Sequence, residues 1–309
     1  MFENGKIGLA AVAAMLVGIP FATGCGDKTS FQLEDTTSRM AYTVNDPLSP
    51  NSAASEAGSD AATVVVTPDN AGFETPSDGV RNQNNLVRNP GGDNANQLFA
   101  GKSYTGTNVD GGPAEIYVGD TMTVGGEDVF LSVHDNVVGT NRKERALAYT
   151  GNRTSIDTID ELRGRDSHHA TYTGTGRITG NTGPVNLAVD GTLDMTVNFT
   201  GGDADVTGRM DFTTPQGADN GNGLTSMTFD GQFADGSADY SIDNIKIQKD
   251  EVDYVELDKQ SGVGSFFGAH AGGTVGVFAG SGRTLDDHPS DVNVNGYFVG
   301  STTDNDPPH

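Results

Sequence analysis

The chain has 309 residues, and its 42 acidic and 18 basic side chains give a formal net charge of −24. Such an acidic surface repels nucleic acids and anionic membranes, which argues against a DNA-binding or RNA-binding function. The length allows one large domain or two small ones. The chain has a single cysteine, so it cannot form an internal disulfide.

The first 24 residues predict a signal peptide. Lys6 supplies positive charge, and residues 7–22 form an apolar run that is too short for a comfortable membrane span. Cys25 follows the small residues at the end of this run and resembles the cysteine of a bacterial lipobox. We therefore expect Cys25 to be acylated and to anchor the protein. The alternative is an ordinary secretory signal with an incidental cysteine.

Residues 25–97 predict a disordered tether that begins at the lipidated cysteine. The segment is rich in small and polar residues and in proline, and Val64–Val66 is its only apolar cluster. Such a composition buries too little apolar surface to offset the entropy of ordering the chain.

Residues 98–165 predict a small β-rich handle region. Short strands are expected at 114–118, 121–124 and 129–133, with glycine-containing turns between them. A short helix is expected from Ser155 to Gly164, because it combines a serine cap, a periodic apolar face and a terminal glycine.

Residues 166–303 predict a β-barrel domain, and residues 304–309 a disordered tail. Apolar and polar residues alternate along successive segments, and one phase change predicts a β-bulge near Asp243 and Asn244. Strands recur every 10–15 residues or so, which is typical of an up-and-down antiparallel barrel. The clearest alternating set is Val185, Leu187, Val189, Leu193, Met195, Val197 and Phe199.

Alternation fits a soluble barrel with its apolar face inside, and also a lipid-embedded barrel with that face outside. The chain has no tryptophan and few tyrosines, so it lacks the aromatic girdles of a lipid-embedded barrel. We therefore expect the soluble arrangement.

Four segments resemble the barrel domain of the transferrin-binding-protein-B-like surface lipoproteins, in the order of that family. They are Tyr172-Thr-Gly-Thr-Gly, Val189-Asp-Gly-Thr-Leu-Asp-Met, Phe229-Asp-Gly-Gln-Phe, and a final stretch with Gly264-Ser-Phe-Phe-Gly268, Ala271 and Val275-Gly-Val-Phe278. The resemblance covers about residues 165–303. It implies an eight-stranded barrel preceded by a handle, here as a single-lobe member.

The resemblance also implies a location and partners. It implies an outer-membrane lipoprotein, anchored by lipid at the cell surface, that binds transferrin, haemoglobin, haem or another protein of the host or the environment. A TonB-dependent receptor and a lipoprotein-export barrel are the expected bacterial partners, and a monomer is the expected state. The transferrin-contacting loops of the family have no motif that maps onto this chain.

Motifs for catalysis are missing from the sequence. It has no serine nucleophile elbow, no phosphate-binding loop and no His-Glu-x-x-His zinc motif, so we do not expect an enzyme. No cofactor is predicted, and haem is the alternative, because haem needs an axial ligand such as histidine in a largely apolar pocket. His270, beside Phe267, is the first candidate for ligand binding and His134 the second.

Other polar clusters favour structural roles. His168 and His169 are adjacent on a strand, so their side chains point to opposite faces and cannot share a metal. The segments 201–205 and 219–223 offer oxygen ligands for calcium, but they lack the spacing of a calcium loop and are expected to be turns.

The stretch from Gly264 to Gly280 predicts the end of one strand, a turn at 268–273 and the start of the next strand. One of the rings of Phe266 and Phe267 is expected to face the core and the other to face out. Val275, Val277 and Phe278 indicate another phase shift in the following strand.

Together these features predict an all-β chain with a soluble, C-terminal, eight-stranded antiparallel up-and-down barrel. The predicted function is a lipid-anchored cell-surface binding protein that captures an iron or haem source for uptake. The alternative is a structural or adhesive surface lipoprotein without a small-molecule ligand.

Overall fold

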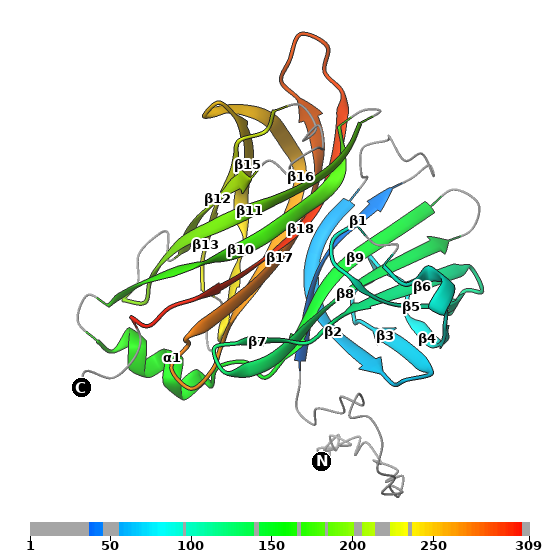
Figure 1. Ribbon diagram of the computed structural model, residues 1–309, viewed down its shortest axis with the longest axis horizontal. Helices are drawn as coiled ribbons and strands as arrows, with labels where there is room; N and C mark the ends of the chain where they lie inside the picture. The colour runs from blue at the N-terminus through cyan, green and yellow to red at the C-terminus, as the bar shows by residue number, and fades with distance from the viewer. Residues whose placement is uncertain are drawn as a thin grey trace, which may run out of the picture.

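The chain folds into two β-barrels that lie side by side (Figure 1). The structure, a computed structural model, describes residues 37–45, 56–94, 97–138, 142–165, 168–182, 185–200, 206–213, 223–233 and 237–304. Strands dominate these residues, which confirms the all-β class. The predicted signal peptide, Cys25 and residues 305–309 of the predicted tail lie outside the described residues.

The first barrel contains nine strands in the order β6-β5-β4-β3-β2-β1-β9-β8-β7. An additional pairing of β6 with β8 closes eight of them into a ring, and β7 extends it as a hairpin with β8. The strands are β1 (Thr37–Asn45), β2 (Glu56–Val66), β3 (Asn70–Glu74), β4 (Gln83–Arg88), β5 (Gly101–Thr107), β6 (Pro113–Gly119), β7 (Met122–Val124), β8 (Glu127–Val138) and β9 (Arg142–Gly151), with a 3-10 turn, η1 (Pro90–Gly92), before β5.

The boundary between tether and handle was predicted wrongly. Strands β1 to β4 lie in the segment expected to be a tether, and they complete one barrel with the strands of the expected handle. Met40, Tyr42 and Val44 alternate along β1 and are buried in the barrel core. A closed barrel therefore begins at Thr37 and replaces the small handle.

Composition misled because the apolar residues that β1 to β4 contribute to the core are spread singly among polar residues and glycines. The buried ring of Tyr42 lies so close to Gly58 and Gly79 that a Cβ atom at either glycine would overlap it. One large ring against two glycines fills the space that several aliphatic side chains would otherwise occupy. Such a segment reads as polar and glycine-rich although it is well packed.

The second barrel confirms the predicted eight-stranded antiparallel barrel. Its nine strands follow the order β14-β16-β15-β13-β12-β11-β10-β18-β17, and a pairing of β16 with β17 closes eight of them, leaving β14 beside β16. The strands are β10 (His169–Thr182), β11 (Val185–Asn198), β12 (Val206–Thr213), β13 (Ser226–Gly231), β14 (Asp239–Ser241), β15 (Asp243–Lys249), β16 (Val252–Phe267), β17 (Gly273–Thr284) and β18 (Asp291–Ser301).

The alternation of apolar and polar residues determines which side chains of the second barrel face its interior and which face outward. Along β11, Leu193 and Met195 are buried in the core, whereas Thr192 and Asp194 are exposed. The apolar face therefore points inward, as predicted. The predicted β-bulge is also confirmed, because the register between β13 and β15 shifts and Asn244 has a φ of 49°.

One α-helix, α1 (Ile156–Arg163), lies among the described residues and confirms the predicted helix. The Ser155 side chain caps it by accepting a hydrogen bond from the Thr158 backbone N–H at 3.2 Å. Ile159 and Leu162 are buried in the core of the second barrel. The helix therefore belongs to the second barrel, although it was expected in the handle. No helix in the described ranges is long and apolar enough to cross a membrane.

A third hydrophobic core joins the two barrels. Leu131, Leu147 and Tyr149 of the first barrel pack with residues from β16 and β17, including Val275 and Val277. Strand β17 is consequently buried on both faces, since Phe278 points into the second barrel. The register of β17 with β18 is continuous, so the phase shift predicted in this strand is wrong. Apolar residues on both buried faces of β17 give the same sequence pattern as a phase shift would.

Charged and backbone contacts close the interface around this core. The Asp239 carboxylate accepts from the Arg39 Nε at 2.7 Å and from the Arg153 guanidinium at 2.5 Å. Burial raises the pKa of Asp239, but hydrogen bonds and charges from its partners outweigh that effect, so the pKa is lowered overall. Nearby, Gly125 in the β7–β8 turn and Gly268 after β16 meet backbone to backbone, and both have positive φ.

Candidate functional site

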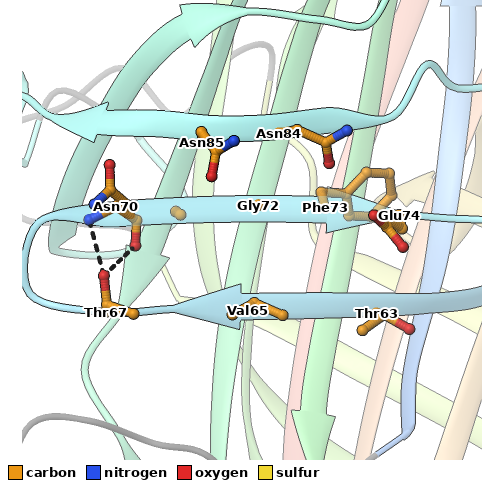
Figure 2. Close-up of a pocket in the computed structure, with 10 residues that line it drawn as sticks. Thr63, Val65, Thr67, Asn70, Gly72, Phe73, Glu74, Asn84 and Asn85 are labelled. Carbon is orange, nitrogen blue, oxygen red and sulfur yellow. Dashed lines mark hydrogen bonds between the residues drawn. The ribbon is translucent and has the colours of Figure 1, made fainter. Parts of the chain in front are cut away.

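An open groove crosses the outer face of three strands of the first barrel, β2, β3 and β4 (Figure 2). Its volume is ≈ 580 Å³, within the range of ligand-binding sites in proteins. Ten residues line the groove, and Glu74 is the only ionisable one among them: Thr63, Val65, Thr67, Asn70, Ala71, Gly72, Phe73, Glu74, Asn84 and Asn85.

A tight turn positions one end of the groove. The segment Thr67-Pro-Asp-Asn70 joins β2 to β3, and proline favours the second position of such a turn. The Thr67 hydroxyl donates to the Asn70 carbonyl and accepts from the Asn70 N–H, each at 3.0 Å. These bonds use the backbone of Asn70 and leave its amide side chain toward solvent.

A β-bulge in β4 forms one wall of the groove. Ala71 pairs with Leu86 and Phe73 with Gln83, so Gly72 alone opposes two residues, Asn84 and Asn85. Asn85 has a φ of 55°, which asparagine tolerates better than most side chains. Both asparagines are exposed, and their amides are directed toward β3 in Figure 2.

Gly72 keeps the floor of the groove free of side-chain atoms. Its neighbours along β3, Ala71 and Phe73, are buried, so the side chain of any residue at this position would point into the groove. A Cβ atom there would meet only the Gln83 carbonyl oxygen, at 3.4 Å, within a radius of 4 Å. The glycine is therefore compatible with a larger residue that would fill the groove.

His134, a predicted ligand-binding residue, lies beneath this face and inside the barrel. Its ring centroid is 4.0 Å from that of Phe73, and its Nε2 is 2.8 Å from the Ser132 hydroxyl. Burial lowers the pKa of His134 to about 3, so the imidazole is neutral at physiological pH. Within the described residues its Nδ1 has no hydrogen-bond partner. His134 is fully buried and does not reach a ligand in solvent.

Phe267, another predicted ligand-binding residue, is fully buried between the two barrels. Its ring packs edge-on against Tyr149 at a centroid distance of 6.0 Å. Phe266, its neighbour, points into the second barrel, as expected for one of the two rings. The other ring was expected to face out, but it faces the first barrel.

His270 is exposed on the turn between β16 and β17. The turn is held by its backbone, since the Thr154 hydroxyl donates to the Gly268 carbonyl at 2.9 Å and the Tyr172 hydroxyl to the Ala271 carbonyl at 2.6 Å. The structure thus places His270, Phe267 and His134 in three different environments and does not bring them together.

The sequence offers oxygen ligands for a metal in two glycine-rich segments. No group of three or more ligating side chains occurs among the described residues. The segments 201–205 and 219–222, which carry oxygen ligands, lie outside the described residues.

A buried polar network that the sequence did not predict lies inside the first barrel. The Gln83 amide donates to the Asn136 side chain at 2.7 Å, and the Arg81 backbone N–H donates to the Glu144 carboxylate at 2.6 Å. Burial raises the pKa of Glu144, and the nearby positive charges of Arg142 and Arg81 only partly offset it. These bonds pair polar groups of three strands with one another in the interior, although Gln83 Oε1 and Glu144 Oε1 have no hydrogen-bond partner among the described residues, and we assign the network a structural role.

The groove was missed because it lies entirely in the segment predicted to be a tether. Two local signals pointed to strands there. Val64–Val66 ends β2, and Thr67-Pro-Asp-Asn70 has the residue order of a turn between strands. The bulge at Asn84 and Asn85 has no such signal, because it depends on the pairing of β4 with β3.

The fold and groove define a class of protein: two closed antiparallel barrels that share a core and carry an open groove on an outer face. No protein-family model matches the sequence. No curated protein matches it either.

Solved structures of transferrin-binding protein B are similar to this chain in architecture. A double mutant from Haemophilus parasuis matches with a TM-score of 0.42 at 13% identity, over 86% of this chain and 44% of that one. A single mutant from the same organism gives 0.35 at 11% identity over 86% and 75% of the two chains. The isotype 1 protein of Neisseria meningitidis gives 0.33 at 11% over 87% and 63%.

This chain thus spans less than half of the first of these structures. The likeness does not establish membership of a family. The fold rests on the strand pairing of the chain itself.

Proposed function

We propose that this chain is a non-catalytic ligand-binding lipoprotein of the cell surface, held in the outer membrane by acylated Cys25. The lipobox-like sequence before Cys25 supports the anchor. Thr37 begins β1 only 12 positions after Cys25 (37 − 25), so the connection spans at most about 40 Å. Binding would therefore take place close to the membrane.

The observation that carries the binding function is the groove on the outer face of the first barrel. Within the described ranges, the interior of the second barrel is filled by aromatic rings and offers a ligand no such space. In the second barrel, Phe266 is surrounded by the rings of Tyr172, Phe199, Phe233 and Tyr240, at centroid distances of 5.1 to 5.6 Å. Ligand would thus bind an outer surface of a rigid scaffold, and the groove on β2–β4 offers such a surface.

The ligand class we propose is an iron or haem source. The sequence resemblance supports it, and the similar solved structures carry the name transferrin-binding protein. The candidate ligands are a transferrin-like protein, haemoglobin or haem, passed on to a TonB-dependent receptor after a lipoprotein-export barrel has delivered the protein to the surface. His270 is an exposed histidine, and we propose that it contacts such a ligand.

The test is direct binding to the mature chain from Cys25 onward, immobilised in detergent. Iron-loaded transferrin, haemoglobin and free haem are offered in turn, and haem is also followed by its Soret absorbance. Saturable binding of one of them is expected, and His270→Ala is expected to weaken it. Failure of all three to bind would refute the iron or haem source.

An adhesive surface lipoprotein is the second candidate function. The groove favours it because an open groove on a sheet face admits an extended ligand, whereas a small molecule is usually enclosed. Adhesion of the whole bacterium to a coated surface, compared with a strain that lacks the protein, tests this function.

A further inference from the structure

The groove on β2–β4 offers hydrogen-bonding side chains that have no hydrogen-bond partner among the described residues. Figure 2 shows hydrogen bonds only between Thr67 and Asn70 among the residues drawn. In the described part of the chain no hydrogen bond reaches the side chains of Thr63, Asn84 or Asn85. Each amide offers two donors and an acceptor, and each hydroxyl offers one donor and two acceptor sites. The groove thus presents both donors and acceptors to a ligand.

Apolar surface accompanies these polar groups. Val65 lines the groove and is 53% exposed, and Val87, which pairs with Asn70 beside the groove, is 60% exposed. Gly72 lies between them and leaves a flat floor. A ligand that fits here has an apolar face for the valines and polar groups at its edges.

The charge of the groove selects a neutral ligand. Among the described residues that line it, Glu74 is the one ionisable residue and none is basic. An anionic ligand would meet a chain of net charge −24 without a cation to pair with. A cationic ligand would find a single exposed carboxylate, and such an ion pair contributes little in water.

The backbone excludes one common mode of peptide binding. An extended peptide adds to a sheet by pairing with a free strand edge. Here β3, the central strand of the groove, pairs with β2 on one side and with β4 on the other, so the floor of the groove exposes no strand edge. A ligand on this floor is therefore recognised by the side chains around it.

We infer that this groove binds a neutral oligosaccharide. Sugar rings carry hydroxyl groups at their edges, which pair with amides and hydroxyls, and C–H faces, which pack on valine methyls and a glycine floor. The inference extends the proposed function, since it rests on the chain being a binding protein and names the chemistry of one site. The oligosaccharide is either a free polysaccharide or the glycan of a glycoprotein.

The test uses two variants in the mature chain from Cys25 onward. Gly72→Val places a β-branched side chain on the floor of the groove without burying it in the core. Asn85→Gly removes an amide and keeps the positive φ that this position requires. Asn244→Gly is the matched control, because Asn244 is also an exposed asparagine of positive φ, in the second barrel.

Binding is measured by calorimetry and saturation-transfer NMR with neutral glucans and mannans, and with a sialylated oligosaccharide as the charged comparison. We expect saturable binding of a neutral probe and weaker binding of the sialylated one. Gly72→Val is expected to weaken binding at least tenfold and Asn85→Gly severalfold, with no change for Asn244→Gly. No binding to any neutral probe, or equal binding by Gly72→Val, overturns the inference.

A second arm separates the two sources. A glycoprotein that carries neutral glycans is offered before and after enzymatic removal of its glycans. Binding lost on deglycosylation identifies a protein-linked glycan, and binding of free glucan or mannan alone identifies a polysaccharide. Binding that survives deglycosylation but is lost in Gly72→Val shows a protein-binding groove and overturns the inference. Transferrin or haemoglobin binding that is unaffected by Gly72→Val leaves the proposed function intact even if the groove binds no sugar.

Discussion

Replacement of Asp239 by asparagine tests whether the charged contact between the barrels stabilises the fold. Asp239 is nearly buried, with a side chain 7% exposed, and its two partners, Arg39 and Arg153, are 21% and 20% exposed. Asp239→Asn keeps the shape but leaves two partly buried guanidinium groups without a countercharge. Removing one partner of a buried ion pair costs about 3–5 kcal/mol. Because both arginines retain some contact with water, we expect a loss of about 2–3 kcal/mol.

The free energy of unfolding is measured by urea denaturation and followed by circular dichroism and tyrosine fluorescence, since the chain has no tryptophan. Asp190→Asn is the matched control. Asp190 pairs with Arg177 at 2.6 Å but is 52% exposed, and such surface pairs contribute about 0–1 kcal/mol. If Asp239→Asn destabilised the protein no more than this control, the assigned role of the buried cluster would be wrong.

The difference in unfolding free energy between wild type and Asp239→Asn is also expected to depend on pH. The pKa of Asp239 is lowered by folding from its ordinary value of 3.8, so the unfolded chain takes up the proton first. The stabilisation by this carboxylate is therefore complete above pH 3.8 and is lost as the pH falls through the folded pKa. The gap in unfolding free energy between wild type and Asp239→Asn should be constant near neutral pH and narrow in acid. A gap that widens in acid would contradict this sign.

Three further predictions address other parts of the molecule. Gly79→Ala places a Cβ atom against the Tyr42 ring and should lower the unfolding free energy, measured by urea denaturation, by about 1–3 kcal/mol. Gly91→Ala is the control and should change it little, because the nearest atom to its Cβ is 3.6 Å away. Equal effects of the two variants would contradict the packing of the first barrel. Burial lowers the pKa of His134 from 6.5 to about 3. Between these two pH values the unfolding free energy of wild type should fall by up to about 1.4 kcal/mol per pH unit, relative to that of His134→Leu, as the pH is lowered. Parallel pH profiles of the two proteins in urea denaturation would refute the burial of His134. Cys25→Ser should move the protein from the detergent phase to the aqueous phase in Triton X-114 partitioning, and unchanged partitioning would exclude the lipid anchor.

The sequence alone determined the elements that follow local rules. The alternation along β11 predicted which side chains of that strand are buried, because a strand with one face in the core repeats every two residues. Ser155 and Gly164 marked the ends of α1, since capping depends on residues next to one another in the chain. The bulge at Asn244 was likewise visible as a change of phase.

Only the tertiary structure shows which residues are buried by contact between the two barrels. Val275, Val277 and Phe278 of β17 are all buried, because one face of the strand lines the second barrel and the other contacts the first. Phe267 is buried for the same reason, so its sequence neighbours could not show whether it faced solvent or another domain. Burial by a partner element leaves no periodic signal in the strand itself.

The first barrel and its groove also depended on contacts between distant residues. Tyr42 fills space left by Gly58 and Gly79, and Gly72 faces the bulge at Asn84 and Asn85 only after β3 and β4 have paired. Composition averages over a segment and so cannot register which ring meets which glycine. The hydrophobic period of a strand is a local property, whereas the filling of a barrel and the shape of its outer face are set by residues brought together when the ring of strands closes.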